Sequence, residues 1–333
     1  MSSALPRSVP STGGRTVNRP PRRPTQSARF TFRPSPPYSL ALTAARFTRW
    51  PEAVDRFDGE TYRRLLPLGR AGLLVAVRQV ASGRDPALSV ALRGPDAATP
   101  TARRAAEHVV RVGLGAGLDT RPFLRAFRND PLLGQPLRRF RGLRIAGAPS
   151  LWEAIVTAVL SQQVSLVFAY DVRRELALAF GARRRFGGEL FVAFPAPASI
   201  ARQTLETLRA FRLSGAKAAA LLRLGEAFAS GELSDDAIER LPDEEAIERL
   251  VEIKGVGRWT AEIGLLRGQG RADVFPGGDL GVVKYLAVGL LGHSARVTER
   301  EMRAFAERWR PYRGLALMYA YAEINRRTSE KNA

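Results

Sequence analysis

The sequence predicts a mainly α-helical protein with an α+β domain near its N-terminus. Apolar residues recur at helical spacing from about residue 119 to residue 325. Three β-like runs, at 62–68, 72–80 and 88–93, come before that region and are separated by glycine and proline. With 333 residues, 45% of them hydrophobic, the chain is long enough to form two or three domains with buried cores.

The N-terminal part divides into an arm and a small domain. Residues 1–34 are rich in Pro, Ser, Thr and Arg, with Arg19-Pro-Pro-Arg-Arg23 at the centre. This segment has too little apolar surface to fold, so we predict a disordered basic arm. Residues 35–114 should form an α+β domain, in which helices at 40–50 and 101–112 cover the three antiparallel strands.

The remainder of the chain should be an all-α array. The run Leu151 to Leu160 is apolar on nearly every side and predicts a central buried helix. Gln162 and Gln163 follow it, and buried amides need hydrogen-bond partners, although a solvated turn is the alternative. Further helices are predicted at 121–127, 132–140, 167–180, 216–230, 280–291, 299–309 and 311–325.

A helix, a glycine hairpin and a second helix are predicted around residue 255. Helical spacing after Pro242 ends at Gly255 and Gly257, which permit a tight reversal, and a new helix starts near Arg258. The hairpin would point backbone N–H groups outward at a helix N-terminus, where a phosphate can bind. Because short glycine patterns are weak signals, an ordinary helical turn is the alternative.

Asp279 is the residue on which chemistry is most plausibly centred. Gly277 and Gly278 before it let the backbone approach a ligand, and helical spacing resumes at Leu280. A simple helix N-cap is the alternative role for this aspartate. Only one helix and a short loop separate Asp279 from the hairpin, so both could face one cleft. A phosphate clamp beside a carboxylate suggests chemistry on a nucleotide.

The composition favours a polyanionic partner and excludes several classes of site. Lys+Arg 52 against Asp+Glu 32 gives a net charge of +20, which indicates nucleic acid, although coding bias and a basic tail are the alternative. The absence of cysteine excludes disulfides, thiolate zinc sites and cysteine-held iron–sulfur clusters. No run of about 18 apolar residues and no secretory signal are present, so we expect a cytoplasmic, nucleoid-associated protein.

Several blocks of the sequence resemble the helix-hairpin-helix superfamily of DNA glycosylases. The segment from Lys254 to Ala261, followed by 273–279, is similar to the hairpin, the Gly/Pro-rich loop and the aspartate of that family. The AlkA-type branch, DNA-3-methyladenine glycosylase II, gives the best match. Further blocks at 149–154, 161–165, 211–217 and 308–313, and Pro36-Pro-Tyr38, extend the resemblance over nearly all of residues 36–325.

The resemblance implies a fold and a division into units. The fold would be the HhH-GPD glycosylase fold, with two helical domains and a TATA-binding-protein-like antiparallel sheet domain. The sheet domain would take residues 35–114. One helical domain would combine 115–148 with 271–327, and the other, which carries the hairpin, would be residues 149–270.

The resemblance also assigns roles to residues. Asp279 matches the catalytic aspartate, and Gln163 stands at the wedge that fills the gap left by the extruded nucleotide. The remaining assignments are Gln162, Trp259 and Tyr321 in the base pocket; Lys254, Gly255, Val256, Gly257 and Thr260 at the DNA phosphate; and the carbonyls of Val251, Ile253 and Val256 around a monovalent cation, Na or K. Many relatives have leucine at the wedge, and Tyr321 and Ile263 replace a tryptophan and a tyrosine.

The implied activity is monofunctional hydrolysis of alkylated purines from duplex DNA, of the 3-methyladenine and 7-methylguanine type, leaving an abasic site. Bifunctional relatives carry a lysine nucleophile where this chain has Trp259, so a Schiff-base route is not expected. The protein would act as a monomer, without a required cofactor. A glycosylase for deaminated or oxidised bases, and a non-catalytic DNA-binding protein with the same hairpin, are the competing hypotheses.

Overall fold

Five strands near the N-terminus form one antiparallel sheet, in which β3, β4 and β5 correspond to the three predicted runs and β1 and β2 are additional. The structure is a computed structural model, and it describes residues 25–50, 52–69, 72–281, 283 and 297–331. The strands are β1 (Gln26–Phe32), β2 (Asp55–Phe57), β3 (Thr61–Leu66), β4 (Leu73–Ala81) and β5 (Ala87–Gly94), in the order β1-β5-β4-β3-β2. On β5, Leu88, Val90 and Leu92 are buried whereas Arg93 is exposed, so one face of the sheet packs on the core.

The prediction of a disordered arm is wrong for its last residues, because 26–32 form strand β1. This strand pairs with β5 in the register Arg29↔Ala91 and Phe30↔Val90. Ala28, Phe30 and Phe32 are half-buried, and the residues between them are exposed. The strand therefore has one apolar side. The arginine-rich segment that precedes the strand obscures this alternation in the sequence. Residues 1–24, the rest of the predicted arm, lie outside the described residues.

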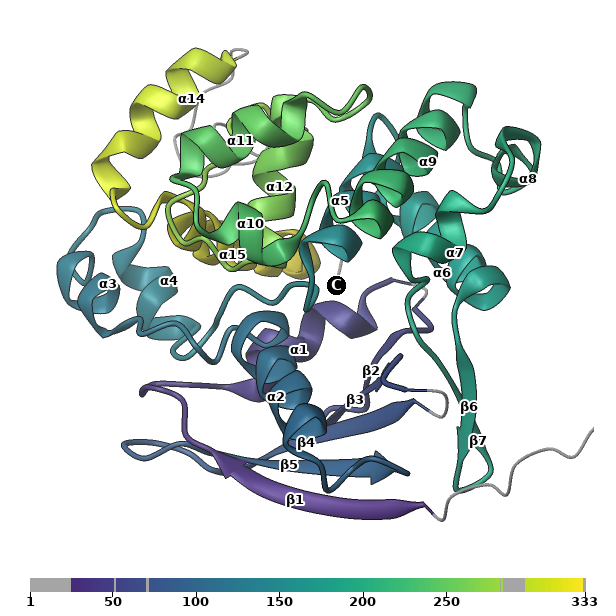
Figure 1. Ribbon diagram of the computed structural model, residues 1–333. Coiled ribbons are helices and arrows are strands. Elements are labelled where there is room, and N and C mark those ends of the chain that lie inside the picture. The colour runs from purple at the N-terminus through teal and green to yellow at the C-terminus, as the bar shows by residue number, and fades with distance from the viewer. Residues whose placement is uncertain (1–24, 51, 70–71, 282, 284–296, 332–333) are drawn as a thin grey trace, which may run out of the picture.

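Helices cover the inner face of the sheet and form the rest of the molecule (Figure 1). The helices of the described chain are α1 (Leu40–Ala44), α2 (Pro100–His108), α3 (Arg121–Ala126), α4 (Gly134–Arg139), α5 (Leu151–Ser161), α6 (Leu166–Phe180), α7 (Pro197–Ala201), α8 (Leu205–Arg209), α9 (Gly215–Ser230), α10 (Asp235–Glu239), α11 (Asp243–Val251), α12 (Arg258–Gly268), α14 (Glu299–Ala306) and α15 (Arg313–Lys331). Short turns of other helix types follow α1 as η1 (Ala45–Thr48), α2 as η2 (Val109–Gly113) and α14 as η4 (Glu307–Trp309). The predicted helix at 280–291 begins at Leu280, and most of it lies outside the described residues.

A β-hairpin interrupts the region that was predicted to be all α, which is a second correction. Strands β6 (Arg183–Phe186) and β7 (Glu189–Val192) pair across Gly187 and Gly188, whose φ angles are 58° and 84°. Two glycines with positive φ are typical of a tight two-residue hairpin turn. The buried Phe191 packs with Leu65 and Leu74 on the outer face of the main sheet. Arginine at three successive positions conceals this short strand pair in the sequence.

Besides the small cluster around Phe191, three larger clusters of buried side chains form the core of the described structure. One lies between the sheet and α1, α2 and η2, one surrounds α5, and one joins α3 and α4 to α14 and α15. We propose that these clusters mark the three units given above, with the sheet unit extended to include β1. The central α5 is buried on nearly every side, as predicted.

Helix α12 lies directly against α5, which fixes the position of the hairpin. A Cβ on Gly264 would come within 2.5 Å of Ile155, and a Cβ on Gly268 within 2.7 Å of the Leu151 backbone. The two glycines therefore allow the helix backbones to approach closely. No helix in the described part of the chain has the length and apolar content required to cross a membrane.

Candidate active site

The hairpin between α11 and α12 packs on α9 and leaves its amides outward. Gly255 has a φ of 104°, and a Cβ there would meet the Cβ of Ala220 at 2.5 Å. Val256 is buried and anchors the turn, whereas Lys254 is exposed. Gly257 is the N-cap of α12 and has open space where a side chain would be. The N-terminus of α12 is therefore accessible to an anion.

Gln162 and Gln163, at the end of α5, have different environments. The Gln162 amide nitrogen donates to the carbonyl oxygen of Gly255 at 3.1 Å and to the hydroxyl of Thr260 at 2.9 Å. This pair of bonds ties α5 to the hairpin. Gln163 is exposed and has a φ of 54°, which is uncommon for a residue other than glycine. Its loop also exposes Val164, which gives this projection an apolar flank.

Three hydrogen bonds to the Asp279 carboxylate come from residues that the structure describes. The indole nitrogen of Trp259 donates to Oδ2 at 3.0 Å, and the Tyr321 hydroxyl donates to Oδ1 at 2.9 Å. The backbone N–H of Gly281 also donates to Oδ1, at 2.7 Å, so the aspartate caps the following helix as the alternative reading expected. Burial and the neighbouring Asp279 carboxylate raise the pKa of Tyr321 well above its ordinary value. Tyr321 is therefore a neutral donor to the acid.

The glycines before Asp279 accommodate a neighbouring helix. A Cβ on Gly277 would come within 2.7 Å of the Arg303 side chain, and one on Gly278 within 2.9 Å of the Glu299 carboxylate. Arg303 donates to the carbonyl oxygen of Phe275 at 3.0 Å and pairs with the buried Glu262 of α12. The close approach of α14 is a reason for both glycines that does not involve a ligand. They let α14 lock the loop that carries Asp279.

An arginine that the sequence analysis did not single out lies on the same face of α12 as Trp259. Residues 259, 263 and 267 follow one another at intervals of four, so their side chains share one side of the helix. Arg267 Nη1 donates to the carbonyl oxygen of Ala146 at 2.6 Å, and Arg46 Nη1 donates to the same oxygen at 2.6 Å. The four-residue spacing from Trp259 could have identified Arg267. Nothing local in the sequence indicates that Arg46 meets it.

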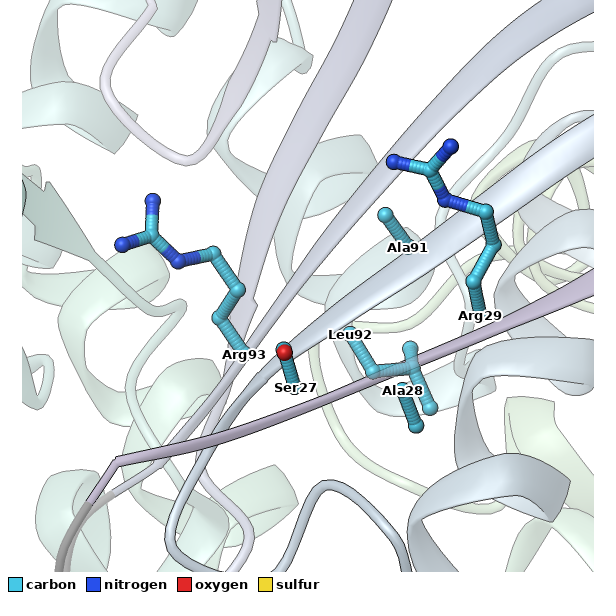
Figure 2. Close-up of a pocket in the computed structure, with 6 residues that line it drawn as sticks. All are labelled: Ser27, Ala28, Arg29, Ala91, Leu92 and Arg93. Atoms are coloured by element: carbon cyan, nitrogen blue, oxygen red, sulfur yellow. The ribbon is translucent and has the colours of Figure 1, made fainter.

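A shallow hollow of about 250 Å³ lies elsewhere, on the outer face of the sheet between β1 and β5. Figure 2 shows Arg29 and Arg93 pointing to one side of the two strands, with Ala91 between them. This hollow belongs to the face opposite the helices and includes none of the predicted site residues. The chemistry is therefore expected at Asp279.

The described residues contain no group of three or more histidine, aspartate or glutamate side chains that could hold a metal ion. Helix α12 also contains no lysine that could act as a nucleophile, and position 259 is tryptophan. Within the described structure, the chemistry available at Asp279 is that of a fixed carboxylate, two aromatic rings and nearby main-chain amides. Such a group can stabilise positive charge and orient a water molecule.

Comparison with known proteins places these features in a family. The model of HhH-GPD, described as a superfamily of base excision DNA repair proteins, matches residues 156–311. A DNA-3-methyladenine glycosylase of Bacillus subtilis (strain 168) is 32% identical over 203 residues, which cover 61% of this chain and 67% of the relative. The DNA-3-methyladenine glycosylase 2 of Escherichia coli (strain K12) is 30% identical over 231 residues, covering 65% and 77%.

Solved structures have the same fold. A 3-methyladenine DNA-glycosylase from Archaeoglobus fulgidus superposes with a TM-score of 0.76 and 24% identity, covering 89% of this chain and 98% of that chain. A Schizosaccharomyces pombe 3-methyladenine DNA glycosylase, solved with abasic DNA, has 28% identity and a TM-score of 0.50, covering 60% and 94%. The predicted combination of an antiparallel sheet domain with helical domains is therefore confirmed.

Proposed function

This chain belongs to the HhH-GPD superfamily of base excision DNA repair proteins, and we propose that Asp279 is the carboxylate with which it hydrolyses glycosidic bonds. The protein is a DNA glycosylase of the 3-methyladenine type, which removes alkylated purines from duplex DNA and leaves an abasic site. The relatives favour this function over the competing hypotheses of deaminated or oxidised bases and of non-catalytic binding. The hydrolysis needs no cofactor.

The observation that carries the role of Asp279 is its attachment to the hairpin helix. Trp259, which donates to the carboxylate, is the second residue of α12, and the hairpin ends at the N-cap of the same helix. Between a phosphate at the N-terminus of α12 and the acid there is therefore only the first turn of the helix and one indole side chain. The carboxylate and the anion site are neighbours in the fold.

The chemistry follows from this geometry. An extruded purine that is alkylated on N3 or N7 is cationic and leaves as a neutral base, taking the electron pair of the glycosidic bond. Positive charge then develops on the sugar, and the Asp279 carboxylate stabilises it. Water adds to C1′, and Asp279 accepts its proton. The three donors to Asp279 keep the carboxylate in place throughout, which avoids reorganisation during the reaction.

The aromatic residues have a second use beside Asp279. Because the polar atoms of Trp259 and Tyr321 both bind the carboxylate, we propose that their rings are the parts that contact the base. A cationic purine over such a ring gains about 0.5–2 kcal/mol. Gln162 supports the site from the hairpin side through Gly255 and Thr260. Gln163, exposed and in a left-handed conformation, is the proposed wedge that enters the duplex when the nucleotide leaves.

The proposal extends to a monovalent cation at the hairpin. The carbonyls of Val251 and Ile253 lie at and just beyond the C-terminus of α11, where helix carbonyls lack intrahelical partners and the dipole attracts positive charge. The Ile253 carbonyl accepts one bond, from the N–H of Val256, and keeps a second lone pair. With the carbonyl of Val256 these oxygens suit Na or K. A cation there would also bring positive charge toward the DNA phosphate.

We also propose that the protein works as a monomer, in the cytoplasm, on nucleoid DNA. The net charge of +20 supports strong attraction to DNA, and the aspartate, the aromatic pair and the hairpin all come from one chain. The absence of cysteine leaves no thiolate for an iron–sulfur cluster.

Incubation of the purified protein with N-methylated duplex DNA tests the function. We expect release of methylated purines and the appearance of abasic sites that break only after alkali treatment, because the chain has tryptophan and not lysine at position 259. Strand cleavage without alkali would contradict the hydrolytic mechanism. Binding to the duplex without any release of base would support the non-catalytic hypothesis instead.

A further inference from the structure

Arg46 and Arg267 form a pair of like charges in contact with one carbonyl group. Each donates from Nη1 to the oxygen of Ala146 at 2.6 Å, and Arg46 also donates from Nη2 to the Tyr170 hydroxyl. Burial and the charge of Arg46 lower the pKa of Arg267 to about 9. No ion pair between either residue and a carboxylate is found in the described structure. Holding two half-buried guanidinium groups together in this way costs stability. Such clusters of perturbed charges are typical of ligand-binding and catalytic sites.

The position of the pair along α12 points to the base. Arg267 follows Trp259 by eight residues, about 12 Å along the helix axis, in the direction away from the hairpin. The negative charge of Asp279 acts on Arg267 and raises its pKa against the effect of burial, so the guanidinium lies in the vicinity of that carboxylate. The proposed phosphate site is at the opposite end of α12. A purine that extends from the sugar away from its phosphate therefore approaches Arg267.

A guanidinium distinguishes purines by their acceptors. It has five N–H donors and no acceptor, so it can bind the O6 oxygen of a guanine but cannot accept from the N6 amino group of an adenine. Alkylation at N3 or N7 makes either base cationic, so repulsion by the two arginines affects both kinds of lesion. The difference that remains between them is the hydrogen bond to O6.

We propose that Arg46 and Arg267 read the O6 edge of the extruded base and favour alkylated guanines over alkylated adenines. This inference rests on the proposed function of Asp279 and names the substrate class within it. Arg267 makes the contact, and Arg46 holds it in position through the shared Ala146 carbonyl and the bond to Tyr170. Because Arg46 lies on η1, which belongs to the sheet domain, this proposal gives the sheet domain a part in the selection of the base.

The test compares two lesions in one reaction. A methylated duplex contains both 7-methylguanine and 3-methyladenine, and single-turnover rate constants for the two are measured by chromatography of the released bases. In Arg267→Met we expect the ratio of the 7-methylguanine rate to the 3-methyladenine rate to fall about tenfold, the usual effect of losing one hydrogen bond to a charged group. The 3-methyladenine rate should be unchanged or higher, because a positive charge next to a cationic base is removed.

Controls separate this outcome from others. Arg104→Met changes an exposed arginine on α2 and should leave the ratio at the wild-type value. Arg46→Met should also lower the ratio. This second variant tests the proposal if circular dichroism shows that Arg267→Met is not folded. A ratio that stays at the wild-type value in a folded variant, even if both rates fall together, overturns the proposal. Failure of the wild-type protein to release either base would instead count against the proposed function.

Discussion

Replacement of Asp279 by asparagine is expected to slow single-turnover base release from methylated duplex DNA by a factor of at least about 10²–10³. The variant keeps the shape of the side chain but removes the negative charge that stabilises the developing cation on the sugar. It also removes the acceptor for the proton of the attacking water. The measurement is the rate of methylated purine release with enzyme in excess over DNA.

The same substitution should leave the fold and DNA binding intact. Asparagine is as good a helix N-cap as aspartate, so the bond from the Gly281 N–H can persist. Its oxygen can still accept from the Tyr321 hydroxyl. The amide nitrogen that replaces Oδ2 cannot accept from the Trp259 indole N–H, so we expect a loss of about 1–3 kcal/mol in stability, with undiminished affinity for an undamaged duplex. Release of base by Asp279→Asn at the wild-type rate would remove Asp279 from the mechanism.

The second large effect is expected in a buried ionic cluster that joins the sheet to the helices. Arg173 on α6 pairs with Glu153 on α5 at 2.5 Å and with Glu52, which precedes β2. Arg64 on β3 pairs with Asp55 at 2.7 Å and with the same Glu153. All five side chains are nearly inaccessible to solvent. The cluster holds two cations and three carboxylates, and burial raises the pKa of Glu52.

Arg173→Met should destabilise the protein by about 3–5 kcal/mol, because it leaves buried carboxylates without their partner. For a protein of this size the melting temperature should fall by roughly 4–7 °C in calorimetry. The sign of the pH effect also follows. Carboxyl groups that bind protons more tightly in the folded state than in the unfolded state lose stability as the pH rises. The difference in free energy of unfolding between the wild type and Arg173→Met should therefore be larger at pH 8 than at pH 5.

Arg174→Met is the matched control for this prediction. Arg174 is the next residue of α6, and its partner Asp171 is partly exposed. Exposed ion pairs contribute about 0–1 kcal/mol, so this variant should melt within a few degrees of the wild type. If Arg173→Met melted as late as Arg174→Met, the cluster would not be what holds the sheet against the helical part.

The sequence predicts those parts of the molecule that depend on local patterns. The central helix at Leu151, the reversal at Gly255 and the start of a helix after Asp279 follow from apolar spacing, glycine and capping preferences. Strand β1 was missed because its partner β5 is distant in the chain, and the β6–β7 hairpin was missed although its two strands are neighbours in sequence. Their apolar residues are few and lie among arginines, whose outward positions carry no periodic signal.

The candidate site was predicted in its parts but not in its contacts. Asp279, Trp259 and Tyr321 were identified separately, and the structure joins them by hydrogen bonds. Gln162 was assigned to the base pocket, and the bonds of its amide nitrogen to the hairpin are a contact that the sequence did not predict. The meeting of Arg46 with Arg267 connects residues more than two hundred positions apart through the Ala146 carbonyl. Such contacts depend on the packing of whole units, which no local pattern encodes.

The central claim is that the Asp279 carboxylate stabilises a positively charged sugar beside the hairpin. It is tested most directly by the affinity for two duplexes that differ only in the abasic position, one with a neutral tetrahydrofuran and one with a cationic pyrrolidine ring. We predict that the wild-type protein binds the pyrrolidine duplex at least about tenfold more tightly, and that Asp279→Asn binds both equally. A preference for the cationic ring that persists undiminished in Asp279→Asn would contradict the account.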